Sequence, residues 1–270
     1  MISDISGSVK GALIFVENSW LLMFLHSIYV PYTFKKIAEA HPTSYAFRTL
    51  RNRNHFQLFF VNIILALGGG TMVSFLSGEP VSWIVNNKII PTYAIGYYLV
   101  HSVPAVFQFL SSFAPFSDMI LDCIVDGSMR AVIISANVDK IRRKISTNAY
   151  VAQLLLGVLS VTGGGIIYNV SFEDFKFSND VYICAISNIF YIIGADENLK
   201  KIIYQICPIF FDYIYKTLGK PLGFSPKFLR DDAKALGAII ITTGFLLRFK
   251  EFKSVKTSNE KLKIHKEKSL

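Results

Sequence analysis

The chain has 270 residues, of which 52% are hydrophobic and only 17% are charged, and its formal net charge is +9. A soluble domain of average composition has about 25% charged residues, and the mean hydropathy here is +0.42. The apolar residues come in blocks separated by short polar stretches. This pattern excludes an ordinary soluble domain and predicts a protein that crosses a membrane several times.

The basic residues are clustered, and a sequence pI near 9.3 would also suit a nucleic-acid-binding protein. The clusters flank hydrophobic segments, however, and the positive-inside rule explains such an arrangement without a nucleic acid. They consist of Lys35, Lys36, Arg48, Arg51 and Arg53, then Lys140, Arg142, Arg143 and Lys144, and finally seven lysines in the last 21 residues.

Eight apolar segments follow one another along the chain. We expect the first to be a membrane span and not a cleaved signal peptide, because it contains Glu17 and Asn18 and no small-residue cleavage site follows it. The segments are 11–33, 56–77, 90–112, 116–138, 147–171, 179–195, 201–217 and 233–249.

The charge distribution predicts the topology. The first basic loop and the basic tail 250–270 should face the cytosol, and the N-terminus should not. Ends on opposite sides require an odd number of spans, so we predict seven. One of 179–195, 201–217 and 233–249 is then not a full span, since each is shorter than the ~20 residues needed to cross.

Two features of the basic clusters bear on this topology. With seven spans, the cluster 140–144 falls on the non-cytosolic side, which conflicts with the positive-inside rule. The last residues, KEKSL, resemble a dilysine retrieval signal, which predicts residence in an early secretory membrane such as the endoplasmic reticulum.

Two runs of three glycines lie inside apolar segments. Gly68-Gly69-Gly70 is in the second segment, and Gly163-Gly164-Gly165 follows 95 residues later in the fifth; the same alignment places Glu79 opposite Asp174. A three-span unit repeated in tandem inserts upside down the second time, which predicts an inverted repeat.

Consecutive glycines let a helix kink or unwind. Irregular backbone at membrane depth is tolerated only against protein or a water-filled path. We therefore expect both runs to bend their helices around a polar path. Close helix packing through small residues is the alternative.

Four charged residues recur at every fourth position of segment 116–138: Asp118, Asp122, Asp126 and Arg130. They share one helix face, and because charges in lipid are costly, this face should point inward or into water. Asp118 could instead cap the helix start, and Asp126 with Arg130 could form a structural ion pair. The functional interpretation is a path that attracts cations, with Arg130 gating it or binding an anion.

Other polar residues give weaker signals. His101 favours interfacial packing over metal binding, and the three cysteines, Cys123, Cys184 and Cys207, lack paired spacing and are expected to be small buried side chains. The sequence holds no His, Cys, Asp or Glu spacing typical of a metal site, and no nucleotide-binding or hydrolase motif.

These residues resemble one family, the trimeric intracellular cation channels. "LGGGTMVSFLSGEP" (67–80) and "TGGGIIYN" (162–169) are similar to its glycine-rich second and fifth spans, and "SMRAV" (128–132) is similar to a segment of its fourth span. Arg130 stands where the family has a lysine, whereas Ile134 replaces a second basic residue, which weakens the expectation of lipid binding.

The resemblance covers residues 10–175 well and the last third poorly. "ENLKK" (197–201) is similar to the segment that leads into the family's sixth span. On that match, 201–217 and 233–249 would be the last two spans, and 179–195 would be an insertion.

The resemblance implies an all-α membrane protein of seven transmembrane helices. Two inverted three-helix repeats, 11–112 and 116–217, would precede a last helix region at 218–249, and the second and fifth helices would be kinked at their glycines. It further implies a homotrimer in the endoplasmic or sarcoplasmic reticulum membrane. Each protomer would have its own pore for potassium or other monovalent cations, carrying counter-ion current during calcium release and uptake.

The resemblance also implies roles for particular residues, without a covalent cofactor or an enzymatic activity. Phosphatidylinositol bisphosphate would bind at Arg130, Gly69, Gly70, Gly164 and Gly165. The pore and its gate would comprise Gly68, Gly69, Gly70, Gly163, Gly164, Gly165, Asp122, Asp126 and Arg130.

Three alternatives remain open. A small-solute transporter could share the inverted repeat and the broken helices, and a purely structural membrane protein is also possible. "DCIVDGSMRA" (122–131) approaches the signature of CDP-alcohol phosphotransferases, but its spacing differs and the later paired aspartates are absent. A non-saturating cation current would separate the channel from all three.

Overall fold

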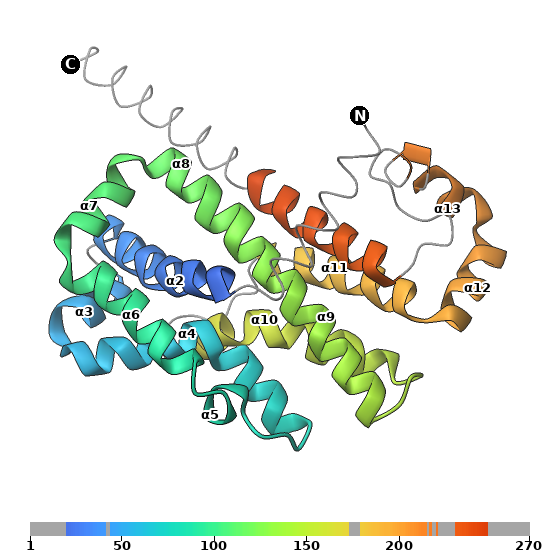
Figure 1. Ribbon diagram of the computed structural model, residues 1–270, viewed down its shortest axis with the longest axis horizontal. Coiled ribbons are helices and arrows are strands. Elements are labelled where there is room, and N and C mark those ends of the chain that lie inside the picture. Colours follow the sequence, from blue (N-terminus) through green and yellow to red (C-terminus); the bar gives the residue numbers. More distant parts are fainter. Residues whose placement is uncertain are drawn as a thin grey trace, which may run out of the picture.

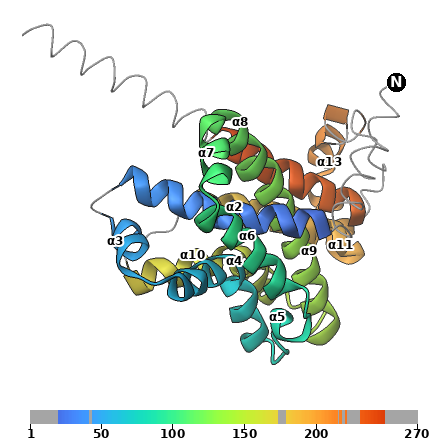
Figure 2. The ribbon, with the colours of Figure 1, turned by 60° about the vertical axis from the view of Figure 1, so that its left-hand side comes forward.

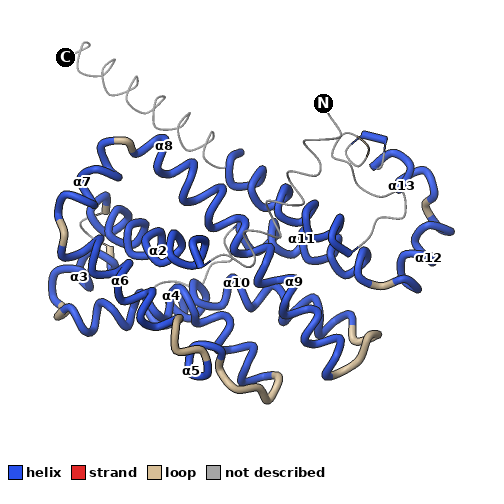
Figure 3. Tube along the Cα trace, viewed as in Figure 1, coloured by secondary structure: helices blue, strands red, loops and turns tan. Residues whose placement is uncertain are grey.

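The computed structural model describes residues 20–41, 44–172, 179–214, 216–217, 220 and 230–247. Within these ranges every regular element is a helix (Figure 3), which confirms the predicted all-α class. Glu17, Asn18, Asp174 and the tail 250–270 lie outside the described residues.

The first long helix, α2 (Trp20–Ala40), contains a buried proline, Pro31, in its interior. Proline has no backbone N–H, so the carbonyl one turn earlier, on Ser27, loses its usual helical donor. Helix α6 (Ile89–Ser102) packs against α2 at this place, where a β-carbon on Gly96 would overlap the Ser27 backbone. The glycine therefore permits the close contact between these two helices.

Two capped helices follow α2. Ser44 caps α3 (Tyr45–Asn52) by accepting from the Phe47 amide, and Asn54 caps α4 (His55–Leu76) by accepting from the Gln57 amide. Side-chain acceptors at these positions satisfy amides that have no partner inside the helix. The Asn54 cap lies in the short turn between α3 and α4, where it sets the start of α4.

The third apolar segment, 90–112, is not one helix. After the short α5 (Ser82–Val85), α6 ends at Ser102, and α7 (Pro104–Ser112) begins with a proline at its first position. The residue before a proline is pushed out of the helical region, and Val103 accordingly has extended dihedral angles.

The fourth segment forms one long rod made of α8 (Ala114–Asp118), η1 (Met119–Asp126) and α9 (Gly127–Lys144). Its middle part, η1, has the wider π-helical hydrogen bonding. Helices α10 (Tyr150–Phe172) and α11 (Asn179–Ala195) follow, and α10 packs against α4, α9 and α11 (Figures 1 and 2).

Segment 179–195 lies in the packed body of the molecule. Cys184, Tyr191 and Ile192 of α11 are buried in one apolar cluster together with Ile241 and Phe245 of the helix at 230–247. Segment 179–195 is therefore part of the bundle, and its expected status as an insertion relative to the family stays a prediction.

Segment 201–217 lies at the periphery instead. It is divided between α12 (Glu197–Ile206) and α13 (Pro208–Ile214), which extend away from the body in Figure 1. Ile206 and Ile209 are 73% and 82% exposed. This segment, and not 179–195, is the one that stands outside the bundle.

Two of the described helices are long and apolar enough to cross a membrane, His55–Leu76 and Tyr150–Tyr168, and the apolar Asn179–Ala195 is shorter. The number of crossings stays a prediction.

Candidate functional site

Helices α4 and α10 cross at their glycine runs with almost no space between their backbones. A β-carbon on Gly69 would lie 2.5 Å from the carbonyl oxygen of Ser160, and one on Gly164 would collide with the carbonyl oxygen of Leu65. Side chains at these two positions would force the helices apart, and this is the close approach that small residues provide between membrane helices.

The contact is reciprocal. Gly69 meets Ser160 and Gly164 meets Leu65, so each glycine contacts the residue four positions before the other glycine. The order of these contacts shows that the helices run antiparallel. The contacts of the other two glycines are equivalent in the same way when the chain is shifted by 95 residues. Gly68 faces Gly164 and Ile167, and the equivalent Gly163 faces Gly69 and Met72.

Neither glycine run interrupts its helix. Helix α4 continues through Gly68–Gly70 and α10 continues through Gly163–Gly165. The helices are therefore not unwound at these positions, and the missing side chains serve the close contact that was the alternative expectation, while the expected bend at both runs stays a prediction. Gly70 and Gly165 differ from the others, since no described atom lies within 4 Å of a β-carbon there.

The irregular backbone occurs in the fourth segment instead. Element η1 spans Met119–Asp126 and so includes Asp122 and Asp126, two of the four charged residues in the stripe. Wide π turns inside α-helices are frequent at functional sites. The charges of the stripe drew attention to this segment, but no residue within 119–126 predicts the π-helical turns.

Asp126 is the centre of a buried polar cluster. Its side chain is 3% exposed; Arg130 Nε donates to its Oδ2 at 2.8 Å, and His26 Nε2 lies 3.4 Å from its Oδ1. On the other side of the imidazole, His26 Nδ1 and Tyr93 Oη are 2.7 Å apart. A buried carboxylate needs such partners, because its desolvation is otherwise prohibitive.

Arg130 is held from three directions. Besides Asp126, its Nη2 lies 3.9 Å from Asp180 Oδ2 at the start of α11, and its guanidinium carbon lies 5.2 Å from the ring centre of Phe245. Two carboxylates thus flank one guanidinium. The predicted structural ion pair between Asp126 and Arg130 is present in the fold.

The other two carboxylates of the stripe also face α2. Tyr29 Oη donates to Asp122 Oδ1 at 2.8 Å, and Tyr32 Oη donates to Asp118 Oδ1 at 3.1 Å. Lys36 forms an ion pair with Asp118. Asp118 makes no side-chain cap hydrogen bond to η1, so it is an interhelical partner and not a helix cap.

A cavity of about 360 Å³ lies beside this cluster, bounded by α2, α3, α4, η1, α9, α10 and α11. Apolar side chains such as Phe34, Leu65 and Ile166 form much of its wall. Its polar lining includes His26, Thr33, Asp126, Arg130, Ser160, Thr162, Tyr168 and Asp180. Gly165 also lines the cavity, so the glycine run of α10 extends from the crossing with α4 to the edge of this space.

The remaining predicted residues lie elsewhere. The His101 ring stacks on Tyr97 with 4.5 Å between the ring centres, and Ile134 is buried in the apolar core. Cys123 and Cys184 are buried as expected, whereas Cys207 is exposed, so the expectation for the third cysteine is wrong. Within the described ranges, no three His, Cys, Asp or Glu side chains form a group that could hold a metal ion.

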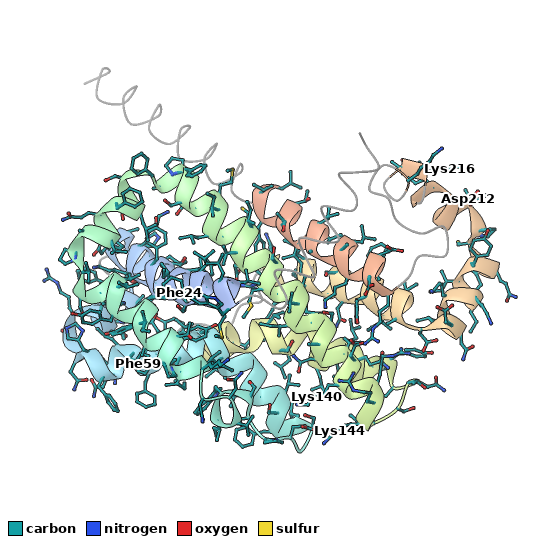
Figure 4. All side chains as sticks on the ribbon, viewed as in Figure 1. Phe24, Phe59, Lys140, Lys144, Asp212 and Lys216 are labelled. Carbon is teal, nitrogen blue, oxygen red and sulfur yellow. The ribbon has the colours of Figure 1, made fainter. Side chains whose placement is uncertain are left out.

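The basic cluster 140–144 has acidic partners that sequence reasoning missed. Lys140 Nζ lies 3.3 Å from Glu79 Oε2, and Lys144 also forms an ion pair with Glu79 (both lysines are labelled in Figure 4). Arg142 Nη1 bonds Asp196 Oδ2 at 3.1 Å. Burial alone would raise the pKa of Asp196, but the Leu199 amide and Arg142 outweigh it and lower that pKa.

These ion pairs reduce the conflict with the positive-inside rule, because two carboxylates, Glu79 and Asp196, offset two of the four positive charges at the end of α9. In the sequence, Glu79, which precedes Pro80, is an acidic residue that could pair with this cluster. Its partners are more than 60 positions away in the chain, so the sequence did not identify them.

The fold and the site together define an all-helical bundle with an antiparallel glycine crossing and a buried, charged cavity wall. Its fold is that of a trimeric intracellular cation channel from C. elegans, whose structure was determined in the absence of Ca²⁺. The two chains superimpose with a TM-score of 0.60 at 20% sequence identity, over 88% of this chain and 94% of the other. The resemblance drawn from the sequence is thereby confirmed at the level of the fold.

No family model matches this chain, and no curated protein matches it.

Proposed function

We propose that this protein is a cation channel of an intracellular membrane, selective for potassium or another monovalent cation. The observation that carries the proposal is the cavity beside the α4–α10 crossing, with Asp126, Arg130 and Asp180 in its wall. The two carboxylates exceed the single guanidinium, so the cluster attracts cations. The fold shared with a trimeric intracellular cation channel supports the same function.

The distribution of side chains supports insertion in a membrane. Phe56 and Phe75 on α4 are 70% and 74% exposed, while Gln153 and Asn188 are fully buried. Bulky apolar groups outside and polar groups inside suit a molecule surrounded by lipid tails. The outer face would therefore lie against the acyl chains.

The reciprocal contacts between α4 and α10 support an inverted repeat. A pseudo-two-fold axis through an antiparallel contact is what two three-helix units of opposite orientation produce. The extent of α4, at 55–76, also corresponds to that of α10, at 150–172, when shifted by 95 residues. In this arrangement the path runs beside the pseudo-two-fold axis, once in each protomer.

The assembly and its physiological role follow from the same proposal. The protein would be a homotrimer in the endoplasmic or sarcoplasmic reticulum, with its C-terminus in the cytosol, and would carry counter-ion current during calcium release and uptake. Arg130 would gate the path. A phosphatidylinositol bisphosphate head group at Arg130 would have to compete with Asp126 and Asp180, because both carboxylates already flank the guanidinium.

The test is single-channel recording in planar bilayers under a potassium gradient. We expect discrete, potassium-selective openings from the wild type and a reduced unitary conductance in Asp126→Asn, because the variant removes a charge from the cavity wall. Asp139→Asn is the matched control, since Asp139 lies on the same rod but pairs with Tyr191 and Arg230. Silence of the wild type, or equal conductance in all three proteins, would refute this assignment.

A small-solute transporter is the second candidate. The cavity volume of about 360 Å³ falls in the range of about 300–1,000 Å³ typical of ligand pockets, and inverted repeats are common in transporters. Flux that saturates with solute concentration would favour the transporter, whereas current that rises steadily with the potassium gradient favours the channel.

A further inference from the structure

A second hollow, separate from the cavity at Arg130, lies on the surface at the turn between α3 and α4. It has a volume of about 410 Å³ and is lined by Arg48, Thr49, Asn52, Arg53 and Gln57. None of these five described lining residues is acidic, and two are arginines. Arginine is the side chain best suited to bind a phosphate group, because its planar fork matches two phosphate oxygens.

Thr49 provides independent support for a ligand in this hollow. Its side chain is buried, with the residue only 4% exposed, and its hydroxyl has no hydrogen-bond partner among the described residues. A buried hydroxyl without a partner is costly and rare in folded proteins. An oxygen acceptor in the hollow would satisfy it.

The start of α4 adds to the attraction for an anion. Asn54 caps this end and binds the Gln57 amide, and the helix has 22 residues. The N-terminus of a helix carries a partial positive charge. The guanidinium of Arg51, by contrast, lies 5.3 Å from the ring centre of Phe47, and Arg51 does not line the hollow.

An exposed apolar strip leads away from the hollow along α4. Gln57, Phe60 and Ile64 share one helix face by their spacing of three and seven positions, and Phe60 and Ile64 are 49% and 37% exposed. A free phosphate ion would make no use of this strip. A molecule that joins a phosphate to hydrocarbon chains would occupy both features.

We propose that the α3–α4 hollow binds the head group of an anionic membrane phospholipid, with its acyl chains along Phe60 and Ile64. The phosphate oxygens accept from Arg48, Arg53 and the Thr49 hydroxyl. This inference rests on the proposed insertion in a membrane, but it does not depend on ion conduction. The site also differs in its residues from the phosphoinositide site proposed at Arg130.

The test uses native mass spectrometry of the purified full-length protein in detergent, titrated with dioleoyl phosphatidic acid. We expect Arg48→Gln and Arg53→Gln each to weaken binding by about fivefold, the effect of one basic group near an anionic head group. Arg51→Gln is the matched control, because it removes the same charge from a neighbouring position that does not line the hollow, and its affinity should stay within about twofold of the wild type.

Thr49→Val separates binding from folding. The variant keeps the shape of the side chain and removes the hydroxyl that lacks a partner, so its melting temperature should equal or exceed that of the wild type. Its affinity for phosphatidic acid should nevertheless fall by roughly fivefold, because a hydrogen bond to a charged oxygen is lost. A merely structural role for Thr49 would not weaken binding while preserving stability.

Two further measurements distinguish a phospholipid from a free phosphate ester, and the α3–α4 hollow from the site at Arg130. Glycerol 3-phosphate has the head group without the chains and should bind at least about tenfold more weakly, because the apolar strip stays empty. Arg130→Gln should leave phosphatidic acid binding at the hollow unchanged. Equal losses in Arg51→Gln, wild-type affinity in the Arg48, Arg53 and Thr49 variants, or equal binding of glycerol 3-phosphate would each overturn the proposal. Loss of current with lipid binding intact would overturn only the channel function.

Discussion

At the scale of single residues, the six glycines of the two runs have different environments although their sequence pattern is the same. Gly69 and Gly164 are covered by the backbone of the opposite helix, whereas Gly70 and Gly165 have open space where a side chain would be. Their sequence positions differ by one, which on a helix is a rotation of about 100°. The difference in environment therefore comes from helix geometry.

We predict that Gly69→Ala lowers the free energy of unfolding by about 1–3 kcal/mol, the usual cost of overpacking. The added methyl group would push α10 away from α4 at Ser160. Gly164→Ala should have a similar effect, because its contacts are the reciprocal ones. Thermal unfolding of the purified protein in detergent measures both changes.

Gly70→Ala is the control for this experiment. It adds the same methyl group in open space, and alanine is favoured over glycine inside a helix by up to about 1 kcal/mol, so the variant should be as stable as the wild type or more so. A loss of stability equal to that of Gly69→Ala would show that the glycines act through local backbone freedom and not through the crossing.

The charged residues of the stripe could be found from the sequence, because a four-residue spacing puts them on one helix face. Their partners His26, Tyr29 and Tyr32 could not be found, since these lie on α2 and are 86 or more positions away in the chain. Long-range contacts of this kind depend on which helix packs against the stripe. Periodicity within one segment does not contain that information.

At the scale of the elements, the rod from Ala114 to Lys144 is tied to its neighbours at both ends. Near its start, Asp118 binds Lys36 and Tyr32 of α2, and near its end, Lys140 and Lys144 bind Glu79 in the turn after α4. The side chain of Glu79 is only 12% exposed. Removing a shielded carboxylate that has two basic partners should cost more than breaking a solvated pair.

Glu79→Gln should therefore lower the free energy of unfolding by about 1–3 kcal/mol, because Lys140 and Lys144 both lose their charged partner. Thermal melting would show the difference. Asp212→Asn is the comparison, because Asp212 of α13 pairs with Lys216 at 3.3 Å with both side chains exposed (both are labelled in Figure 4), and a solvated pair should contribute less than about 1 kcal/mol. Equal effects of the two substitutions would contradict the stabilising role of Glu79.

The boundaries of the helices were partly predictable. Pro104 ends α6, and Asn54 begins α4, by signals that can be identified in the sequence. The π-helical stretch at 119–126 was not predictable, because none of its residues is a glycine or a proline. Its wide turns are recognised from the three-dimensional hydrogen-bond pattern alone.

At the scale of the whole molecule, the seven-span count stays a prediction, and it requires one surplus segment among the last three; the packing favours 201–217 as that segment. Segments 179–195 and 201–217 have similar length and apolar content, so composition could not separate them. Burial separates them, because α11 contributes Cys184 and Asn188 to the interior while α12 and α13 are largely exposed. Which segment is surplus thus depends on the contacts that each makes with other helices and not on its own composition.

We predict that a membrane-impermeant maleimide labels Cys207 of the protein in sealed vesicles when applied from one side. Cys207 is exposed and joins α12 to α13, whereas Cys123 and Cys184 are buried and should stay unlabelled. Peptide mass spectrometry of the labelled protein identifies the modified cysteine. Labelling should disappear in Cys207→Ser. If Cys207 reacts from neither side before the vesicles are dissolved, then 201–217 lies inside the membrane and the assignment of the surplus segment is wrong.

The π-helical stretch has a consequence for how the rod can move. A π turn closes between residues i and i+5 and so holds one residue more than an α turn. If η1 rewound to α-helical hydrogen bonding while Asp118 stayed fixed on Lys36, everything beyond it would turn by about 100° about the rod axis. Such a screw motion would carry the Arg130 guanidinium away from Asp180 without moving the anchored start of the helix. The extra residue in the π turn would therefore allow the helix to rotate by one residue position, at the place where the charged wall of the cavity begins.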